Sequence, residues 1–397
     1  MPKQRPSNDL AALVSNIPEY EDWIVKTTST IATLWSNYGS IDRVTLRPPN
    51  NGEKDQAIII KTVSPPKTDH NRADEGHLRK LLSYEVERWF YHNLAGRLPG
   101  AARVARVYSA KEHDAKAAPI RLVMEDLSVE YSVPAGDTLD LDETKAVLAW
   151  LANFHGTFWG VQNEGDIRPR LVPPPLQYTG GNREGVWQQG SYWYLDTRRS
   201  ELSDIDRRQT WLLELAEKAR NFYHAIQPPG IRLRLFQVDI KMKTEAKTFG
   251  TLLHGDVKGA NIFFAPRPKN NPPRCALYDF QYVGIGLVTR DLAKYLGTTA
   301  RANLLRRIED EKDLLRFYHS ELLRVVHSRK DISPEVASFL EREGEYTFEK
   351  FWEHWELAIV DWHRFMSGWG FWGNEAWVEQ RARQIAANWE KNPSPLS

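Results

Sequence analysis

Residues 252–264 (LLHGDVKGANIFF) place a short set of polar side chains between two apolar runs. The pattern is His-Gly-Asp with an asparagine five residues after the aspartate, which singles out Asp256 and Asn261. A Tyr-Asp-Phe sequence then places Asp279 18 residues beyond Asn261. The apolar residues on both sides predict two short strands that would hold the intervening loop in a rigid frame.

This arrangement suits phosphoryl transfer to a hydroxyl, in which the protein mainly positions the reactants and neutralises charge. Asp256 would orient or accept the proton of the attacking hydroxyl. Asn261 and Asp279 would supply oxygen ligands to a Mg²⁺ ion that bridges the phosphates of ATP, because this ion prefers hard oxygen ligands. Lys258, two residues past Asp256 on an extended loop, would pair with the γ-phosphate. The alternative is a chance turn followed by an ordinary strand end, but the combination of motifs favours the chemical interpretation.

The segment resembles the catalytic loop of the aminoglycoside phosphotransferase and choline kinase group, whose motif is also HGDxxxxN followed by a metal-binding aspartate in a strand. The DFQ sequence at 279–281 and the following YVGIGLVTRDLAKYL are similar to the CHK-kinase-like (ecdysteroid-kinase-like) branch and to related fungal phosphotransferase-like proteins. The resemblance implies a protein-kinase-like bilobal α+β fold. It also implies that Asp291 braces the catalytic loop, although a simple helix cap would explain the same residue.

Lys61 ends a strand-like run that contains three isoleucines (AIIIK, 57–61). A kinase-like fold places at this position the lysine that pairs with the α- and β-phosphates. Its glutamate partner would come from the helix predicted at 83–95, where Glu85 and Glu87 both qualify. The family pattern, a glutamate four residues before the tyrosine of a Phe-Tyr pair, falls on Glu87. Either glutamate alone would also suit an exposed helix surface.

The sequence LVMEDL at 122–127 resembles the strand and hinge that hold adenine through backbone groups. These would be the carbonyl of Glu125 and the amide of Leu127. An edge strand that ends in a turn would have the same sequence pattern.

The phosphate-covering loop departs from the protein-kinase pattern because the chain has no GxGxxG motif. Residues 37–44 (NYGSIDRV) offer only Gly39 and Ser40 between two strand-like runs. These two residues would give backbone and hydroxyl contacts to phosphate, unless they form a plain hairpin turn. The missing glycines, with HGD in place of HRD and no APE-like segment, argue against a protein kinase more than against the use of ATP.

The last third of the chain is rich in aromatic residues. Most follow helical spacing and are expected in the core. Glycines in MSGWGFWGN (366–374) are expected to break the helix and leave Trp369 and Trp372 in a loop, where aromatic faces would bind a cationic substrate. Trp193 and Asp196 in the segment 188–199 are the alternative substrate-binding residues.

The elements needed to position these motifs follow in order along the chain. Residues 1–127 predict a nucleotide-binding lobe with a helical N-terminal extension, and residues 128–397 predict a mainly helical lobe with the catalytic loop, metal site and substrate pocket. The expected elements are a helix at 18–35, two strands within 41–63, a helix at 83–95, a strand at 121–126, a helix from 142 capped by Asp142, a long ordered loop at 163–195, and helices at 205–226 and 302–325.

Composition adds limits on partners and location. The 41% hydrophobic and 26% charged content is that of an ordinary globular protein. A net charge of +1 gives no electrostatic argument for binding nucleic acid. The single cysteine, Cys275, excludes an intramolecular disulfide. The polar N-terminus lacks the apolar core of a secretory signal and no apolar run approaches the roughly 18 residues of a membrane span, so a cytoplasmic protein without membrane insertion is expected.

Together these patterns predict an ATP- and Mg²⁺-dependent kinase that phosphorylates a hydroxyl of a small molecule, of the amino-alcohol, aminoglycoside or steroid-alcohol type. The alternative is a catalytically silent kinase-like protein that binds nucleotide or a partner. Loss of the base or of a metal ligand usually marks such proteins, and this chain has both. The oligomeric state is not indicated by the sequence.

Overall fold

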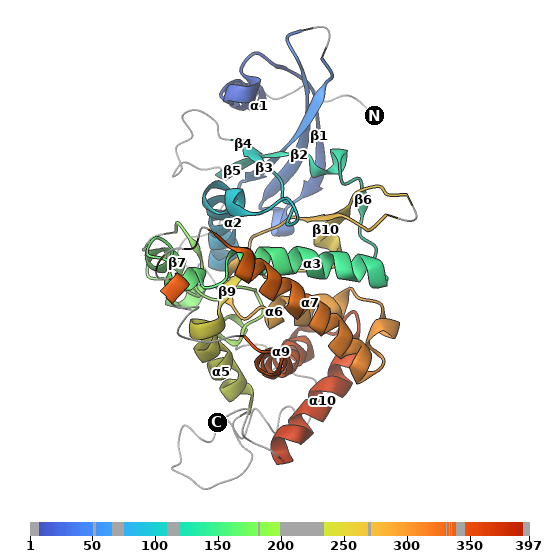
Figure 1. Ribbon diagram of the computed structural model, residues 1–397. Coiled ribbons are helices and arrows are strands. Elements are labelled where there is room, and N and C mark those ends of the chain that lie inside the picture. The colour runs from blue at the N-terminus through green and yellow to red at the C-terminus, as the bar shows by residue number, and fades with distance from the viewer. Residues whose placement is uncertain are drawn as a thin grey trace.

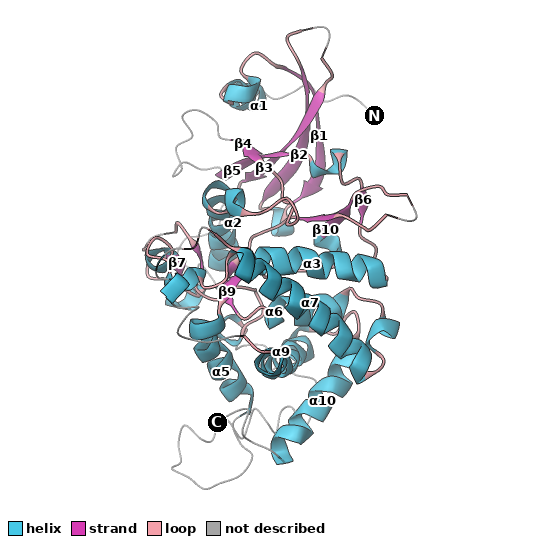
Figure 2. Cartoon of the chain, in the orientation of Figure 1, coloured by secondary structure: helices cyan, strands magenta, loops and turns pink. Residues whose placement is uncertain are grey.

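The structure is a computed structural model. It describes residues 8–50, 53–65, 75–108, 120–181, 183–198, 234–268, 271–330, 332, 334, 336–338 and 346–391. Strands gather at one end of the molecule and helices at the other (Figures 1 and 2). The α+β organisation predicted from the sequence is confirmed, with an antiparallel sheet in the N-terminal part and a mainly helical C-terminal part.

The N-terminal sheet has five strands in the order β1-β2-β3-β5-β4, and every neighbouring pair is antiparallel. Their bounds are β1 Ile24–Thr33, β2 Gly39–Arg47, β3 Gln56–Val63, β4 Val107–Tyr108 and β5 Ile120–Glu125. Helix α1 (Asn8–Ser15) packs near β1, and α2 (Glu75–Asn93) lies between the sheet and the helical part (Figure 1). Strand β3 is central and mostly buried, which explains its run of isoleucines.

The helix expected at 18–35 is wrong. Only Pro18–Tyr20 forms a 3₁₀ turn, and β1 occupies Ile24–Thr33. The strand sequence IVKTTSTIAT consists largely of β-branched residues, whose stiff side chains favour an extended backbone. Long-range pairing with β2, from Ile24 opposite Arg47 to Thr33 opposite Ser40, then stabilises that conformation.

The C-terminal part is built around long helices and two small sheets. The helices are α3 Leu141–Thr157, α5 Arg234–Phe249, α6 Thr289–Thr298, α7 Ile308–Ser328, α9 Phe348–Trp369 and α10 Glu375–Lys391. One small sheet has the order β11-β10-β6 (Cys275–Leu277, Ile262–Phe264, Val133–Pro134). The other has the order β7-β8-β12-β9 (Leu171–Val172, Val186–Trp187, Gly284–Gly286, Thr251–Leu253).

Several expected boundaries shift in this part. Asp140, not Asp142, caps α3: its side chain accepts from the amide of Glu143, and the Glu143 side chain accepts from the amide of Asp140. That capping box fixes the start two residues before the predicted cap. The helix expected at 302–325 is a 3₁₀ turn, Ala302–Leu305, followed by α7. The helix expected at 205–226 lies outside the described residues.

The segment expected as a long ordered loop contains only short 3₁₀ turns and the two-residue strands β7 and β8. The main core joins α3, α6, α7 and α9 to the small sheets. None of the described helices is both long enough and apolar enough to cross a membrane.

Candidate active site

The HGD loop joins β9 to β10 and is held in an unusual backbone conformation. Gly255 has a φ of 84°, and a Cβ atom there would lie 2.2 Å from the carbonyl oxygen of Tyr282. Only glycine fits both requirements, because other residues are strained at positive φ. The tight turn places Asp256 next to the segment that carries Asp279.

Asp291, on the first turn of α6, holds the HGD loop through its carboxylate. Its carboxylate accepts hydrogen bonds from the backbone amides of His254 (2.7 Å) and Gly255 (2.9 Å) and contacts His155 Nε2 at 3.1 Å. The other nitrogen of His155 bonds to the Tyr318 hydroxyl at 2.7 Å. The helix begins at Thr289, so Asp291 is not its cap but a brace for the loop.

His254 links the HGD loop to Tyr278, the residue before Asp279. Its Nδ1 accepts from the amide of Asp256 (3.2 Å), so its Nε2 carries the proton that is donated to the carbonyl of Tyr278 (3.0 Å). Complete burial lowers the pKa of His254, although nearby Asp291 and Asp256 oppose the shift. The ring is therefore neutral near neutral pH and acts as a rigid spacer.

Asp256 is buried and both of its carboxylate oxygens have partners. Lys258 donates to Oδ2 at 2.9 Å and Lys294, from α6, donates to Oδ1. The side-chain amide of Asn261 donates to the carbonyl of Asp256 at 2.9 Å and lies 3.3 Å from Oδ2. Burial would raise the pKa of this carboxyl, but Lys294 and Lys258 together hold it below its usual range. The carboxylate is ionised and fixed in orientation.

Asp279 lies two residues after the end of β11 and has a φ of 69°, a left-handed conformation that is uncommon outside glycine. Its Oδ1 is buried, has no hydrogen-bond donor among the described residues and lies 3.7 Å from Lys61 Nζ. Asn261 uses its amide nitrogen on Asp256, which leaves its amide oxygen for another partner. A carboxylate oxygen that accepts no hydrogen bond and an amide oxygen are hard ligands, so these two residues fit a Mg²⁺ ion.

Lys61 on β3 is buried and pairs with Glu87 on α2 at 2.6 Å. Burial alone would lower the pKa of Lys61, but the carboxylates of Glu87 and Asp279 raise it above its usual value. Glu85 faces away and pairs with Arg88 at 2.5 Å. The Lys61 ammonium group therefore lies between the Glu87 carboxylate on α2 and the Asp279 carboxylate.

Gly39 and Ser40 open β2 at the end of the β1–β2 connection. Gly39 has a φ of 147°, and a Cβ there would lie 1.9 Å from the carbonyl oxygen of Thr62 on β3. The Ser40 hydroxyl donates to Asp42 at 2.8 Å. In the sheet register Ser40 lies opposite Thr62 and Ile41 lies opposite Lys61, so the side chains of Ser40 and Lys61 lie on opposite faces of the sheet.

Glu125 ends β5, opposite Ile58 of β3. Its side chain is held by Arg103 and by the amide of Arg106 (3.1 Å). Leu127 begins a 3₁₀ turn whose cap is Asp126, and a first-turn amide has no partner within its own turn. The structure therefore places both predicted hinge residues where the sheet passes into the helical part.

The predicted substrate residues lie in two different settings. Trp193 is fully buried, with its ring 5.1 Å from that of Trp362, and Asp196 pairs with Lys243 at 2.7 Å. Trp193 lies in the interior of the helical part, whereas Asp196 is half-buried in its ion pair, and their role as substrate-binding residues stays a prediction. Tyr192, next to Trp193, faces Lys294, 4.2 Å from the ring centroid.

The expected break of the last aromatic helix comes later than predicted. Trp369 is the last residue of α9, 53% exposed, and stacks on Phe365 at 5.9 Å. Trp372 follows the helix and packs edge-on against Trp362 at 5.4 Å. The guanidinium of Arg198 lies 4.6 Å from the Trp369 centroid, so a protein cation already covers one aromatic face.

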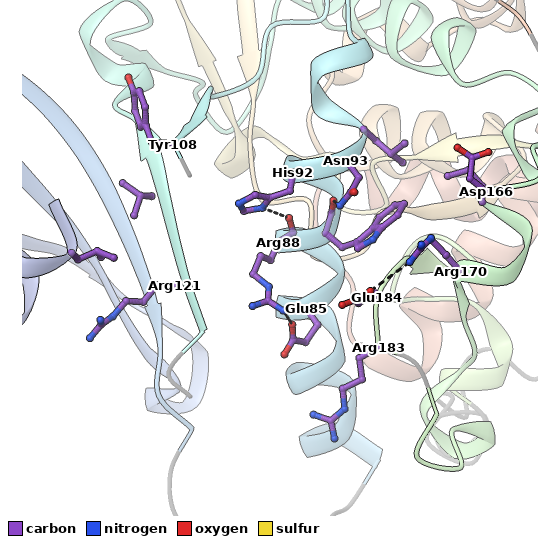
Figure 3. Close-up of a pocket in the computed structure, with 15 residues that line it drawn as sticks. Glu85, Arg88, His92, Asn93, Tyr108, Arg121, Asp166, Arg170, Arg183 and Glu184 are labelled. Carbon is purple, nitrogen blue, oxygen red and sulfur yellow. Dashed lines mark hydrogen bonds and ion pairs between the residues drawn. The ribbon is translucent and has the colours of Figure 1, made fainter. Parts of the chain in front are cut away.

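A cavity of about 570 Å³ lies on the outer face of α2, away from these residues (Figure 3). Glu85, Arg88 and His92 of that helix line it, together with Arg121 from β5 and Arg170 from the other part of the chain. No residue predicted to be catalytic or metal-binding is among its lining residues. The cavity is therefore not the candidate active site.

Lys294 and Tyr192 are the residues near Asp256 that the sequence reasoning missed. Lys294 follows Asp291 by three residues, and residues three apart share a face of a helix. The three-residue spacing in RDLAKYL therefore predicts that Lys294 lies on the same helix face as Asp291, close to the HGD loop. Tyr192 had no such signal, because it comes from an irregular segment.

Comparison with known proteins adds the family. The family model described as "Ecdysteroid kinase-like family" matches residues 36–330, which is 295 of the 397 residues. The chain belongs to the ecdysteroid kinase-like family. This family lies within the aminoglycoside phosphotransferase and choline kinase-like superfamily of kinase-like small-molecule phosphotransferases, which have the protein-kinase-like fold. No curated protein matches the chain.

Solved structures similar to this ecdysteroid kinase-like chain share little sequence with it. A microcompartment-associated aminopropanol kinase is 13% identical, with a TM-score of 0.42 and 98% of each chain covered. A choline kinase from Cryptosporidium parvum is 12% identical, with a TM-score of 0.44, covering 98% of this chain and 97% of that one. An aminoglycoside-3'-phosphotransferase of type VIII is 15% identical, with a TM-score of 0.34 and coverage of 80% and 90%.

Proposed function

We propose that this ecdysteroid kinase-like protein is an ATP- and Mg²⁺-dependent kinase that phosphorylates a hydroxyl of a small molecule. The acceptor oxygen forms a bond to the γ-phosphorus, and the bond from that phosphorus to the β,γ-bridging oxygen breaks, which releases ADP. Asp256 orients the hydroxyl and takes its proton. Asn261 and Asp279 would hold Mg²⁺, which supplies positive charge to the phosphates.

One observation carries this proposal. Lys61 lies 2.6 Å from Glu87 and 3.7 Å from Asp279, so one ammonium group links β3 and α2 to the proposed metal ligand. An ion pair of this kind places a phosphate-binding cation beside the metal site, which phosphoryl transfer requires. Residues 1–127 would then bind the nucleotide, and residues 128–397 would provide the base, the metal ligands and the acceptor site.

The remaining nucleotide contacts are assigned by position. Gly39 and Ser40 lie at the end of the β1–β2 connection, and their backbone would contact the phosphates. The Glu125 carbonyl and the Leu127 amide would hold the adenine edge. Lys258, whose side chain is 37% exposed, would move from Asp256 to the γ-phosphate when ATP binds.

The positively charged side chains Lys294 and Arg198 favour one class of acceptor over the others. Lys294 lies against the face of Tyr192, and Arg198 lies against Trp369 and, at 5.4 Å, against Tyr192. A ligand ammonium group would compete with these protein cations for the same aromatic faces. Among the three acceptor types, this favours a steroid-type alcohol over an amino-alcohol or an aminoglycoside.

A catalytically silent nucleotide-binding protein is the second candidate. It is favoured by one feature, namely that both carboxylate oxygens of Asp256 are already bonded to lysines. The acceptor hydroxyl would have to displace Lys258 before it could reach Oδ2.

The deciding experiment measures ATP consumption with Mg²⁺ across amino-alcohols, aminoglycosides, sugars and steroid alcohols. Asp256→Ala serves as the blank. We expect turnover with a subset of acceptors and a loss of roughly 10² to 10⁴-fold in the variant, the usual range for a positioned base. Equal rates for both proteins on an acceptor that binds would refute the assignment of Asp256. Nucleotide binding without turnover on any acceptor would favour the silent alternative.

A further inference from the structure

Lys294 is a buried cation at the candidate active site that the proposed reaction does not yet use. Its side chain is 0% exposed, and Nζ donates to Oδ1 of Asp256. It comes from α6, one turn after Asp291, which binds the amides of the catalytic loop. One helix therefore supports both the backbone of the loop and the carboxylate that the loop presents.

The two lysines bonded to Asp256 differ in how easily their side chains can move away from it. Lys258 is on the loop itself, and its side chain is 37% exposed. Lys294 is enclosed by the ring of Tyr192, 4.2 Å away, and by the ring of Trp362 at 6.0 Å. Burial costs a lysine its hydration, so the ammonium stays in place because Asp256 compensates its charge. Lys258 can leave the carboxylate at little cost, whereas Lys294 cannot.

We propose that Lys294 is the positioning residue that fixes the Asp256 carboxylate, while Lys258 is the cation that exchanges to the phosphate. The proposal rests on the proposed kinase function. With Oδ1 held by Lys294, Oδ2 is the oxygen presented to the acceptor hydroxyl once Lys258 has moved. The hydroxyl proton then goes to Oδ2, and Lys294 keeps its own protons throughout.

A purely structural ion pair would make a different prediction. It would alter stability without lowering kcat in the folded enzyme. The kinetic constants separate the two roles, because loss of a positioning contact lowers kcat while KM for ATP stays nearly unchanged.

The test compares Lys294→Met with the wild type in hydrolysis of Mg·ATP, with water in the acceptor's place, and on the best acceptor of the panel. We expect kcat to fall about 10²-fold and KM for ATP to change less than about threefold. Lys258→Met is the contrast and should mainly raise KM for ATP. A kcat of Lys294→Met within twofold of the wild type would overturn the proposal.

Two further variants protect the test against misfolding and against failure of the proposed function. Lys294→Gln keeps a hydrogen-bond donor without the charge, so it should fold and still show a reduced kcat. Urea unfolding of Lys294→Met, Asp256→Asn and the double variant needs no turnover. We expect the double variant to unfold at a higher midpoint than Lys294→Met. If the losses of stability in the two single variants simply add in the double variant, the Lys294–Asp256 pairing is wrong. If the losses do not add but the protein shows no turnover on any acceptor, only the kinase function is refuted.

Discussion

At the scale of single residues, the left-handed backbone of Asp279 allows its effect on stability to be tested separately from its proposed role as a metal ligand. Asparagine tolerates a positive φ better than most other residues with a side chain, and it has nearly the shape of aspartate. Asp279→Asn should therefore keep the stability of the wild type but lose the charge that holds Mg²⁺. We expect a loss of about 10²-fold or more in Mg²⁺-dependent turnover, measured by ATP consumption against Mg²⁺ concentration.

Asp279→Ala is the matched control for that experiment. Alanine is strained at positive φ, at a cost of about 1 kcal/mol or more, so this variant should also unfold at lower urea. If Asp279→Asn retained its Mg²⁺ dependence, the assignment of this residue as a metal ligand would be wrong.

The Lys61–Glu87 pair can be tested for stability and activity independently. Both groups are buried, so Lys61→Met leaves an uncompensated carboxylate and should destabilise the protein by about 3–5 kcal/mol. Adding Glu87→Leu removes that carboxylate and should restore much of the stability, measured by urea unfolding. Turnover should stay low in both variants, since the proposed phosphate-binding cation is absent. Recovery of activity in the double variant would count against this role of Lys61.

At the scale of elements, helix α6 and the HGD loop form one unit through Asp291. Asp291→Asn keeps the size of the side chain but gives a weaker acceptor for the amides of His254 and Gly255. Charge-assisted hydrogen bonds are about twice as strong as neutral ones. We expect kcat to fall at least about tenfold and the midpoint of unfolding to drop, because the loop loses its fixed geometry.

Asp313→Asn is the matched control, since Asp313 lies on α7 with a side chain that is 76% exposed and a weak ion pair to Arg316 at 3.5 Å. Its stability should stay within about 0.5 kcal/mol of the wild type, because exposed pairs contribute little. Equal effects of the two substitutions would contradict the bracing role of Asp291.

At the scale of the whole molecule, Cys275 reports on global unfolding. It lies on β11 in the core, and burial raises the pKa of its thiol to about 12. The native thiol should react with a disulfide reagent roughly 10³-fold or more slowly than the unfolded chain, because reaction requires opening of a domain stable by at least about 5 kcal/mol. The labelling rate should follow the urea dependence of tryptophan fluorescence. Rapid labelling in native buffer would show that the β10–β11 region opens locally.

The sequence was sufficient for the features that depend on local pattern. The HGD loop and its flanking strands, the lysine on β3 and the mainly helical second part are all visible as short motifs with a fixed order, because the chemistry and the hydrophobic period constrain neighbouring residues. Local propensity failed at β1, where a partner strand decides between helix and sheet, and at the start of α3, where a reciprocal cap fixed the boundary.

Only the tertiary structure decided which side chains surround Asp256. The choice of Glu87 over Glu85 as the neighbour of Lys61 depends on the rotation of α2 against the sheet. The placement of Lys294 on Oδ1 depends on how α6 packs against the loop, and the contact of Tyr192 with Lys294 depends on an irregular segment. These contacts join residues far apart in the chain, so their geometry is set by packing rather than by sequence spacing.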